Sequence, residues 1–528
     1  MKKLFFYVIL IFCSTNMFGQ NLPEYFKLGN SKLAKISSST PLSNGITDII
    51  VEDNIVLLGT SRGLSTSTDD GETWTNYFDT PDFGTESISA IAYKNGVIWA
   101  ATAHSEDVNG ESVQVGSGLH YSTDGKTWTN IPQPVDDPGD SLITYGINTI
   151  RALPVTVAQQ NVTFDIALTD NAVWITSWAG GLRKSTDNGT TWQRVILPPD
   201  FLDSIKPSDT LSFSLQPVAG SFGPEAYLNH ALFSVLAVDN NTIYAGSAGG
   251  LNKSTDGGIS WRHFTNSNQK HPMSGNWVIG LGYDRFEKAV WAVTRQAESQ
   301  NEVNGVSASF DGGENWDTSL LGKTAWNIGF RYYLDGNGNL TSSDVIIPTN
   351  SGAFRSNDNG NTWINATGIV DSQTGLSINT DVYYGAASKN LNSGNAYVWL
   401  GSAEGTVRLT DTGGMWEGIW KVFLASQDLT SDNSTYAFPN PFSPGLEKVK
   451  IKYTTGNSSA KVTIRILDFD MNLVKTVIQN APRNANIDNI DKWDGTDEFG
   501  NIVPNGVYFY RIDIDSGQTL YGKIIALK

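Results

Sequence analysis

The chain has 528 residues and a formal net charge of −17 at pH 7, with 39% hydrophobic and 17% charged residues. This length allows roughly two to four domains, and the apolar fraction is sufficient for packed cores, which excludes wholesale disorder. The negative charge argues against a nucleic-acid partner, because phosphate binding needs clustered Lys and Arg. The 52 Gly, 16 Trp, 19 Tyr and 23 Phe favour an all-β fold.

Residues 1–19 have the pattern of a secretory signal peptide: Lys2 and Lys3 precede an apolar run that ends at Phe12, and Gly19 precedes a plausible cleavage site. This run is too short to span a bilayer as a helix, and we expect no transmembrane helix elsewhere. A buried N-terminal strand and lipid attachment at Cys13 are the alternatives. Because Cys13 is the single cysteine, the mature chain would lack disulfides, thiolate catalysis and cysteine metal sites. Residues 20–39 would form an N-terminal segment.

One short phrase recurs seven times from residue 67 to residue 416, with Ser-Thr-Asp-Asp-Gly-Glu-Thr-Trp as its first copy. The second copy is one residue shorter and the last is degenerate. Its aspartates and tryptophans are Asp69 and Trp74, Asp124 and Trp128, Asp187 and Trp192, Asp256 and Trp261, Asp311 and Trp316, Asp358 and Trp363, and Asp411 and Trp416. Asp and Gly favour a tight turn, and the Trp opens the next strand and buries a large ring.

Short apolar strands recur upstream of each phrase, such as Ile55–Gly59, Val173–Thr176 and Val398–Gly401, and a further strand precedes them. Four strands in each of seven repeats predict an all-β fold, with a seven-bladed β-propeller over residues 40–424. The repeated phrase resembles the Asp-box, or BNR repeat, of sialidases, two-propeller xyloglucanases, the sorting receptor sortilin and a photosystem assembly factor. This resemblance implies that the boxes are structural and lie on the face away from the ligand.

Residues 425–435 form a polar linker, and residues 436–528 alternate as the strands of a small β-sandwich. The features that identify this unit are a Pro-Asn-Pro-Phe opening at Pro439, an aspartate turn at Asp468, a Trp-Asp-Gly turn at Trp493 and a final strand that reaches the terminus. They resemble the Ig-like fold of the flagellar hook-capping protein and the C-terminal sorting domains of type IX secretion cargo in Bacteroidota. Asn472 stands where those domains usually carry Gly. A generic accessory sandwich is the alternative.

Long connections are expected on one face of the propeller, over blades two to five. They include the loop that starts at His104, the connection Pro132–Gly146, the connection Pro198–His230 and the loop that starts at Arg295. Because loops on a rigid scaffold often carry binding residues, we expect a ligand site on this face. The candidate ligand-binding residues are Arg62, His104, Trp178 and Arg295.

A glycosidase needs two carboxylates across a sugar, and no motif selects a pair here. The candidate catalytic carboxylates in these loops are Asp107, Glu111, Asp136, Asp140, Glu298 and Glu302. A sialidase is disfavoured, because only Arg151-Ala-Leu-Pro154 approaches the Arg-Ile-Pro phrase of that family. The xyloglucanase type uses a cleft between two propellers, whereas this sequence predicts one.

No metal or other cofactor is expected. The five histidines, which are His104, His120, His230, His263 and His271, have no metal-ligand spacing and fit solvated or packing roles. Asp335-Gly-Asn-Gly-Asn339 resembles the start of a calcium loop, but Leu340 replaces the required Gly, so a hairpin turn is the better interpretation.

The leading hypothesis is therefore a propeller that is secreted, or displayed on the surface of a Gram-negative bacterium, and that binds a glycan or a protein on its loop-rich face. Outer-membrane secretion machinery would be the partner of its C-terminal domain. The alternative is a secreted glycoside hydrolase of the Asp-box propeller type.

Overall fold

The computed structural model describes residues 37–527 with gaps at 39, 217–225, 375, 379, 392–393, 426–428, 430–433, 446–447, 486–487 and 516. The predicted signal peptide, Cys13 and most of the predicted linker lie outside the described residues. Two compact units are present, one mainly within residues 37–425 and the other mainly within residues 426–527. Across the described ranges, no helix is long and apolar enough to cross a membrane.

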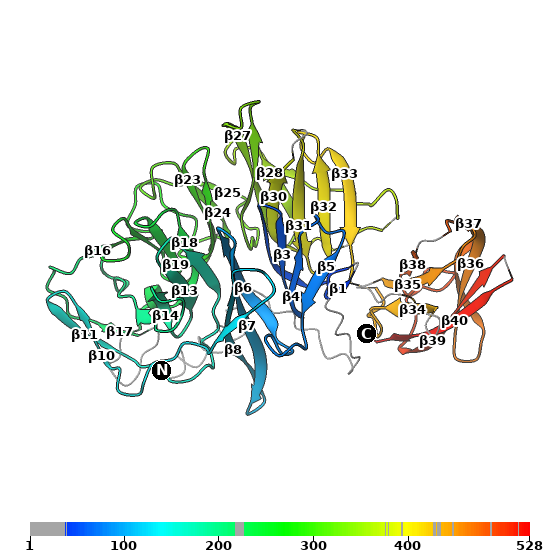
Figure 1. Ribbon diagram of the computed structural model, residues 1–528, viewed down its shortest axis with the longest axis horizontal. Coiled ribbons are helices and arrows are strands. Elements are labelled where there is room, and N and C mark those ends of the chain that lie inside the picture. The colour runs from blue at the N-terminus through cyan, green and yellow to red at the C-terminus, as the bar shows by residue number, and fades with distance from the viewer. Residues whose placement is uncertain are drawn as a thin grey trace. The chain divides into compact units, whose positions relative to one another are not determined.

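The larger unit is a β-propeller, and in the described part of the chain it has seven sheets of four consecutive antiparallel strands (Figure 1). Sheets one to three contain β2 (Ile46–Glu52), β3 (Ile55–Thr60), β4 (Gly63–Ser67) and β5 (Trp74–Tyr77); β6 (Ser87–Lys94), β7 (Val97–Val108), β8 (Glu111–Ser122) and β9 (Thr129–Ile131); and β12 (Asp165–Leu168), β13 (Val173–Ser177), β14 (Gly181–Ser185) and β15 (Gln193–Arg194). Sheets four and five contain β18 (Leu232–Ala237), β19 (Ile243–Ser247), β20 (Leu251–Ser254) and β21 (Trp261–Phe264); and β22 (Trp277–Asp284), β23 (Ala289–Arg295), β24 (Gly305–Ser309) and β25 (Asp317–Ser319). Sheets six and seven contain β26 (Gly329–Leu334), β27 (Leu340–Thr349), β28 (Gly352–Ser356) and β29 (Ile364–Asn365); and β30 (Tyr383–Asn390), β31 (Ala396–Ser402), β32 (Thr406–Asp411) and β33 (Gly418–Phe423).

The first strand of each sheet is its inner strand, and inner strands of successive sheets pack on one another. β2 contacts β6, β6 contacts β12, β12 contacts β18, and β18 contacts β22. The ring closes where β30 packs on β2, so the blue first sheet lies beside the yellow last sheet (Figure 1). Ion pairs join these two sheets, with Lys389 Nζ 2.6 Å from Asp70 Oδ1 and Lys421 Nζ 2.6 Å from Glu72 Oε1. The predicted propeller fold is therefore confirmed.

Six of the seven repeated phrases form a turn between the third and fourth strands in which the aspartate accepts hydrogen bonds from the turn, and four of the six also have the tryptophan bond described below. In the copy at Asp187, Ser185 Oγ donates to Oδ1 (2.8 Å), the Thr191 backbone N–H donates to Oδ1 (2.9 Å), and the Thr191 hydroxyl donates to Oδ2 (2.7 Å). The Gly189 N–H donates to Ser185 Oγ (2.8 Å) and the Trp192 indole N–H donates to the Gly189 carbonyl (3.1 Å). The Thr191 hydroxyl and backbone bonds hold the pKa of Asp187 at about 2, so the turn keeps its carboxylate charged.

In five of the seven turns, a glycine lies close to an aromatic ring of the preceding blade. A Cβ on Gly258 in blade four would lie 2.4 Å from the ring of Trp174 in blade three, and one on Gly71 in blade one would lie 2.8 Å from Trp399 in blade seven. Both tryptophans come from second strands and are buried. The turn therefore sets the packing between neighbouring blades as well as closing its own hairpin.

The seventh phrase differs from the predicted box. Asp411 is fully buried and forms ion pairs with Arg331 (3.0 Å) and Arg355 (3.1 Å), instead of accepting the N–H groups of a turn. Trp416 has a positive φ of 60°, is partly exposed, and stacks on Trp420 at 6.0 Å. The degenerate sequence lacks the leading Ser, so the carboxylate pairs with the arginines of blade six instead.

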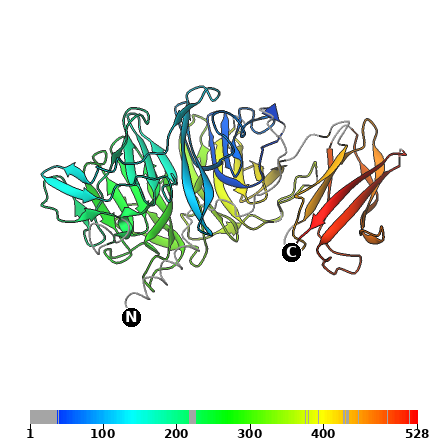
Figure 2. The ribbon, with the colours of Figure 1, turned by 90° about the horizontal axis from the view of Figure 1, so that it is seen from below.

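Three of the predicted loops contain regular structure. The segment that starts at His104 is a continuation of β7 and β8 into a long hairpin that turns at Asn109 and Gly110, both with positive φ. The connections between blades two and three and between blades three and four contribute β10 (Leu142–Tyr145), β11 (Asn148–Ala152) and β17 (Ser214–Leu215), which form a separate three-stranded sheet. In both ribbon views this sheet lies at the periphery of the propeller (Figure 2). β16 (Ser204–Ile205) pairs with β21, η1 (Leu228–His230) is a single 3-10 turn, and β1 (Ser37–Ser38) pairs with β5.

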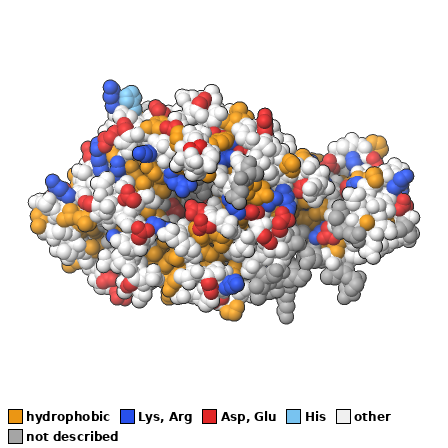
Figure 3. All heavy atoms as spheres, turned by 45° about the horizontal axis from the view of Figure 1, so that its top comes forward, with side chains coloured by type: hydrophobic (Ala, Val, Ile, Leu, Met, Phe, Trp, Pro, Cys, Tyr) orange, Lys and Arg blue, Asp and Glu red, His pale blue; other side chains and the backbone are white. Residues whose placement is uncertain are grey.

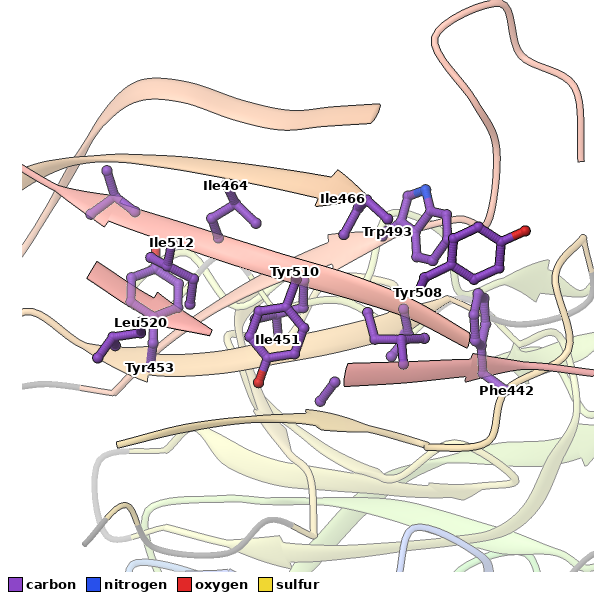
Figure 4. Packing of buried hydrophobic residues seen from close by; sticks show 14 of the residues in the cluster. Phe442, Ile451, Tyr453, Ile464, Ile466, Trp493, Tyr508, Tyr510, Ile512 and Leu520 are labelled. Atoms are coloured by element: carbon purple, nitrogen blue, oxygen red, sulfur yellow. The ribbon is translucent and has the colours of Figure 1, made fainter. Parts of the chain in front are cut away.

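The smaller unit is a β-sandwich. One sheet contains β34 (Thr435–Phe438), β35 (Val449–Thr454) and β38 (Asp488–Trp493), and the other contains β37 (Leu473–Arg483), β36 (Ala460–Leu467), β39 (Gly506–Ile514) and β40 (Thr519–Ala526). Alternate residues of both sheets form one core, in which Ile451, Ile464, Trp493, Tyr508 and Tyr510 are buried (Figure 4). Asn472 donates its side-chain amide to Asp468 Oδ2 (3.1 Å) and so completes the aspartate turn that was predicted.

We predict that Gly258→Ala destabilises the propeller by about 1–3 kcal/mol, because the new Cβ would meet the Trp174 ring inside a packed interface. Gly96→Ala is the matched control: φ is +84° there and +88° at Gly258, but nothing lies within 4 Å of a Cβ at Gly96. Urea unfolding of both variants measures the difference. Equal losses would show that backbone strain, and not contact between blades, makes the glycine necessary.

Candidate functional site

The predicted catalytic carboxylates do not form a pair. Asp136 is buried and bonds to Arg183 (2.7 Å) and to the Val155 N–H (2.7 Å), so it anchors the connection to blade three. Glu302 is buried and accepts backbone N–H bonds from Asn276 (2.9 Å) and Ala297 (2.8 Å). Both carboxylates hold loop backbone, which is a structural role.

The other four candidate carboxylates are exposed and lie on three different segments. They are Asp107 and Glu111 at the tip of the β7–β8 hairpin, Asp140 in the connection after blade two, and Glu298 after β23. Asp107 and Asp140 accept backbone N–H bonds of their own turns, from Gly110 (2.8 Å) and Asp137 (3.1 Å). Within the described residues, no hydrogen bond joins two of these carboxylates.

The predicted ligand-binding residues lie at the face where inner strands begin and second strands end, which we call the loop face. Arg62 is partly exposed, 4.7 Å over the Phe78 ring, and His104 bonds to Ser117 (2.7 Å) and Glu86 (3.0 Å). Trp178 is partly buried against an apolar cluster that includes residues of blades four and five. Arg62, His104 and Trp178 therefore do not share contacts that would make one site. Arg295 contacts the rings of Trp277 and Trp326 instead.

Aromatic side chains form an arc around the loop face at the starts of five inner strands. Phe164 stacks on Phe233 at 5.3 Å, and Phe233 packs on Trp277 at 5.3 Å. Further along the ring, Trp326 packs on Tyr384 at 5.4 Å. The guanidinium of Arg295 joins the two halves, 5.5 Å from the Trp277 ring and 4.4 Å from the Trp326 ring. We call these five rings and Arg295 the aromatic arc.

The exposed part of the arc is its second half. Phe164 and Phe233 are buried, whereas Trp277, Trp326 and Tyr384 are partly exposed. Flat aromatic faces beside a few polar groups are typical of small-molecule and carbohydrate sites. The arc therefore offers a platform on which a flat, partly apolar ligand such as a sugar ring could stack.

Two carboxylates lie on inner strands directly beside the arc. Asp48 in β2 and Asp165 at the start of β12 are both partly exposed, and each accepts the N–H of the next residue at 2.8 Å. Asn327, which follows Trp326, donates to Asp48 Oδ1 (3.1 Å). Asn327 also accepts the N–H of its own next residue (2.7 Å), so it has the same local conformation as the two aspartates.

The environment raises the pKa of both carboxyl groups. Burial raises the pKa of Asp48 to about 6 and that of Asp165 to about 7, and the charge of Asp48 adds to the increase at Asp165. Near neutral pH the pair can therefore hold one proton, with Asp165 the more protonated member. Two carboxyl groups with separated pKa values are the arrangement that general acid–base chemistry uses. We call Asp48 and Asp165 the acidic pair.

Sequence reasoning missed the acidic pair and the two tryptophans of the arc. Both aspartates stand in inner strands, at places where a propeller usually buries apolar side chains. The available signal was the polar residue directly after an aromatic one in Phe164-Asp165 and Trp326-Asn327. It becomes visible only when the inner strands are superimposed on one another.

Acidic, basic and hydrophobic side chains are interspersed on the face drawn in Figure 3. Three histidines, His120, His230 and His263, are buried and hydrogen-bonded, and burial lowers the pKa of His230 to about 3. In the described ranges, no group of three or more His, Cys, Asp or Glu side chains could hold a metal ion. Asp335 forms a hairpin turn through the Asn339 N–H (2.8 Å), as predicted.

Comparison with known proteins finds carbohydrate-active relatives, whereas no protein-family model matches the chain. The chain is 22% identical over 382 residues to the xyloglucanase Xgh74A of Acetivibrio thermocellus, a match that covers 65% of this chain and 41% of the relative. It is 25% identical over 268 residues to a xyloglucanase of a Paenibacillus species, covering 46% of this chain and 24% of the relative. The chain thus spans less than half the length of these relatives.

The solved structure of an ancestral GH74 enzyme matches with a TM-score of 0.50 and 15% identity, covering 93% of this chain and 63% of that chain. At this identity the match supports the fold alone. This protein is therefore an all-β propeller that is similar to xyloglucanases in sequence.

The raised pKa of Asp165 predicts an unusual pH dependence of stability. The folded chain holds this proton more tightly than the unfolded chain does. The free energy of unfolding therefore falls as pH rises from 3.8, the ordinary pKa of an aspartate, to about 7, the pKa of Asp165 in the folded chain. Asp165→Asn should flatten this part of the pH profile in urea unfolding, while Asp107→Asn, at an exposed hairpin tip, should leave the slope unchanged. An Asp165→Asn profile with the wild-type slope would contradict the raised pKa of Asp165.

Proposed function

We propose that this protein is a carbohydrate-active propeller, and specifically a glycoside hydrolase that acts on a β-glucan of the xyloglucan kind. The observation that carries the proposal is the acidic pair beside the exposed part of the aromatic arc. The similarity to xyloglucanases supports the substrate class. The platform would hold sugar rings, and the two carboxyl groups would supply the chemistry.

In the proposed reaction Asp48 is the base that takes a proton from water and Asp165 is the acid, and burial raises the pKa of both carboxyl groups towards neutrality. Water attacks the anomeric carbon as Asp48 accepts its proton, and the glycosidic oxygen leaves with the proton of Asp165. The products are a new reducing end and a free hydroxyl, and a proton moving from Asp48 to Asp165 restores the pair.

A second function is binding of the same glycan without cleavage. The observation that favours it is the set of backbone bonds at each carboxylate: Asp165 Oδ2 accepts the Val235 N–H of the next blade at 2.8 Å. Carboxylates held in this way can serve as links between inner strands. A glycan would also bind to a single propeller here, whereas the xyloglucanases that the repeats resemble use a cleft between two propellers.

We predict that the chain releases reducing sugars from xyloglucan, with a rate that falls below pH 6 and above pH 7 as the pair loses its one-proton form. Asp48→Asn and Asp165→Asn should each lower kcat by at least about 100-fold, the scale of general acid–base catalysis. Asp107→Asn is the control and should retain wild-type activity.

Affinity electrophoresis in xyloglucan gels separates the two functions. Retarded migration without turnover would identify a binding protein and remove the catalytic roles of the acidic pair. If the chain shows neither retarded migration nor turnover, the carbohydrate function itself is contradicted.

We also propose that the sandwich is an Ig-like sorting domain and that the protein is secreted, or displayed on a Gram-negative cell surface, through outer-membrane secretion machinery. The Pro-Asn-Pro-Phe opening, the aspartate turn and the final strand β40 support this proposal. Removing residues 426–528 should leave the propeller in the periplasm of its native host, as cell fractionation would show. Protease resistance of the retained propeller is the control for folding, and undiminished secretion of the shortened chain would remove the sorting role.

A further inference from the structure

Arg295 differs from the other buried arginines of the described residues, because it has no acidic partner. Arg183 pairs with Asp136 (2.7 Å), Arg331 with Asp411 (3.0 Å), and Arg355 with both Asp344 (2.7 Å) and Asp411. Arg408 lies 3.7 Å from Glu72. Arg295 is only 8% exposed, and its Nε and Nη2 atoms donate no hydrogen bond to any described residue. Among the described residues, the other buried guanidinium groups therefore have acidic partners, and Arg295 has none.

The unpaired charge lies between two tryptophan rings on the loop face. Trp277 is the cross-strand partner of Arg295, and Trp326 comes from the next blade. The indole N–H groups of both tryptophans are also buried and without a partner in the described ranges. Burial alone lowers the pKa of Arg295 to about 10, so the group stays charged at neutral pH. N–H donors of three neighbouring residues thus have no acceptor among the described residues.

The acidic residues of the same loop do not fill this role. Glu302 is held by the Asn276, Ala297 and Ser299 backbone N–H groups, and Glu298 is exposed. A buried cation without a counter-charge is unfavourable for folding. Such a group is expected where a bound ligand supplies the counter-charge. The aromatic rings on either side add the flat surfaces that a sugar ring needs.

We propose that Arg295, Trp277 and Trp326 form a subsite for a negatively charged sugar, with the ring on the tryptophans and the anionic group on the guanidinium. The inference rests on the carbohydrate function proposed above and adds to it a preference for glycans that also carry carboxylate or sulfate groups. A uronic acid and a sulfated sugar share this chemistry. With a net charge of −17, the chain repels polyanions in general, so binding of one must come from a specific site.

The test compares polysaccharides in affinity electrophoresis and isothermal titration calorimetry on the full chain. The probes are polygalacturonate, its fully methyl-esterified form, dextran sulfate and neutral xyloglucan. We expect polygalacturonate or dextran sulfate to bind at least 10-fold more tightly than esterified polygalacturonate, and the better of the two polyanions identifies the anionic group. The preference should weaken as salt is added, because the contact is ionic.

Arg295→Gln should abolish this preference for polyanions, whereas Arg295→Lys should retain part of it. Arg285→Gln is the matched control, because Arg285 belongs to the same blade as Arg295 and lies 4.6 Å over the ring of Tyr332 in β26, but is exposed at the turn between β22 and β23. A merely structural Arg295 would show lower stability in Arg295→Gln and no change in selectivity, which would overturn the inference.

The outcomes distinguish this inference from the function on which it rests. Binding of neutral glycan without any preference for polyanions would contradict the anionic subsite and leave the carbohydrate function standing. Arg295-dependent binding of polyanions without binding of xyloglucan would support the subsite and contradict the neutral substrate. Binding of none of the four polysaccharides would overturn both.

Discussion

The packing of a turn glycine on an aromatic ring of the preceding blade is the contact on which the propeller depends. Gly71, Gly189, Gly258 and Gly360 each approach a buried second-strand tryptophan so closely that a Cβ would lie within about 3.2 Å of its ring. The aspartate of each turn fixes the glycine in place through bonds to the turn backbone. One phrase therefore closes a hairpin and also joins two blades, which explains why it recurs with so little variation.

A ring joined in this way fixes the starts of the inner strands relative to one another. The aromatic arc depends on that rigidity, because its rings come from five different blades and contact one another across the blade boundaries. The acidic pair depends on it too, since Asp48 and Asp165 come from blades one and three. The boxes thus hold the scaffold at one end of each blade, while the polar chemistry gathers at the loop face.

The sequence predicts the fold better than the site. The turn phrase and the strands before it locate the blades, because a tight turn followed by a buried indole has few structural solutions. The site depends on residues that are distant in sequence, such as Asp48 with Asn327 and Arg295 with Trp326, and no local pattern indicates that they meet. Burial also reverses expectations: Asp136 and Glu302 resemble loop carboxylates in the sequence, yet each holds backbone inside the fold. Of the predicted ligand-binding residues, Arg295 alone belongs to the aromatic arc.

A crystal structure of the chain with a bound xyloglucan oligosaccharide would test the central claim most directly, since it would show where a glycan meets the propeller. The account predicts sugar rings stacked on Trp277 and Trp326, with a glycosidic oxygen within hydrogen-bonding distance of Asp165. A glycan bound at the peripheral three-stranded sheet, or at the face that carries the aspartate turns, would contradict it.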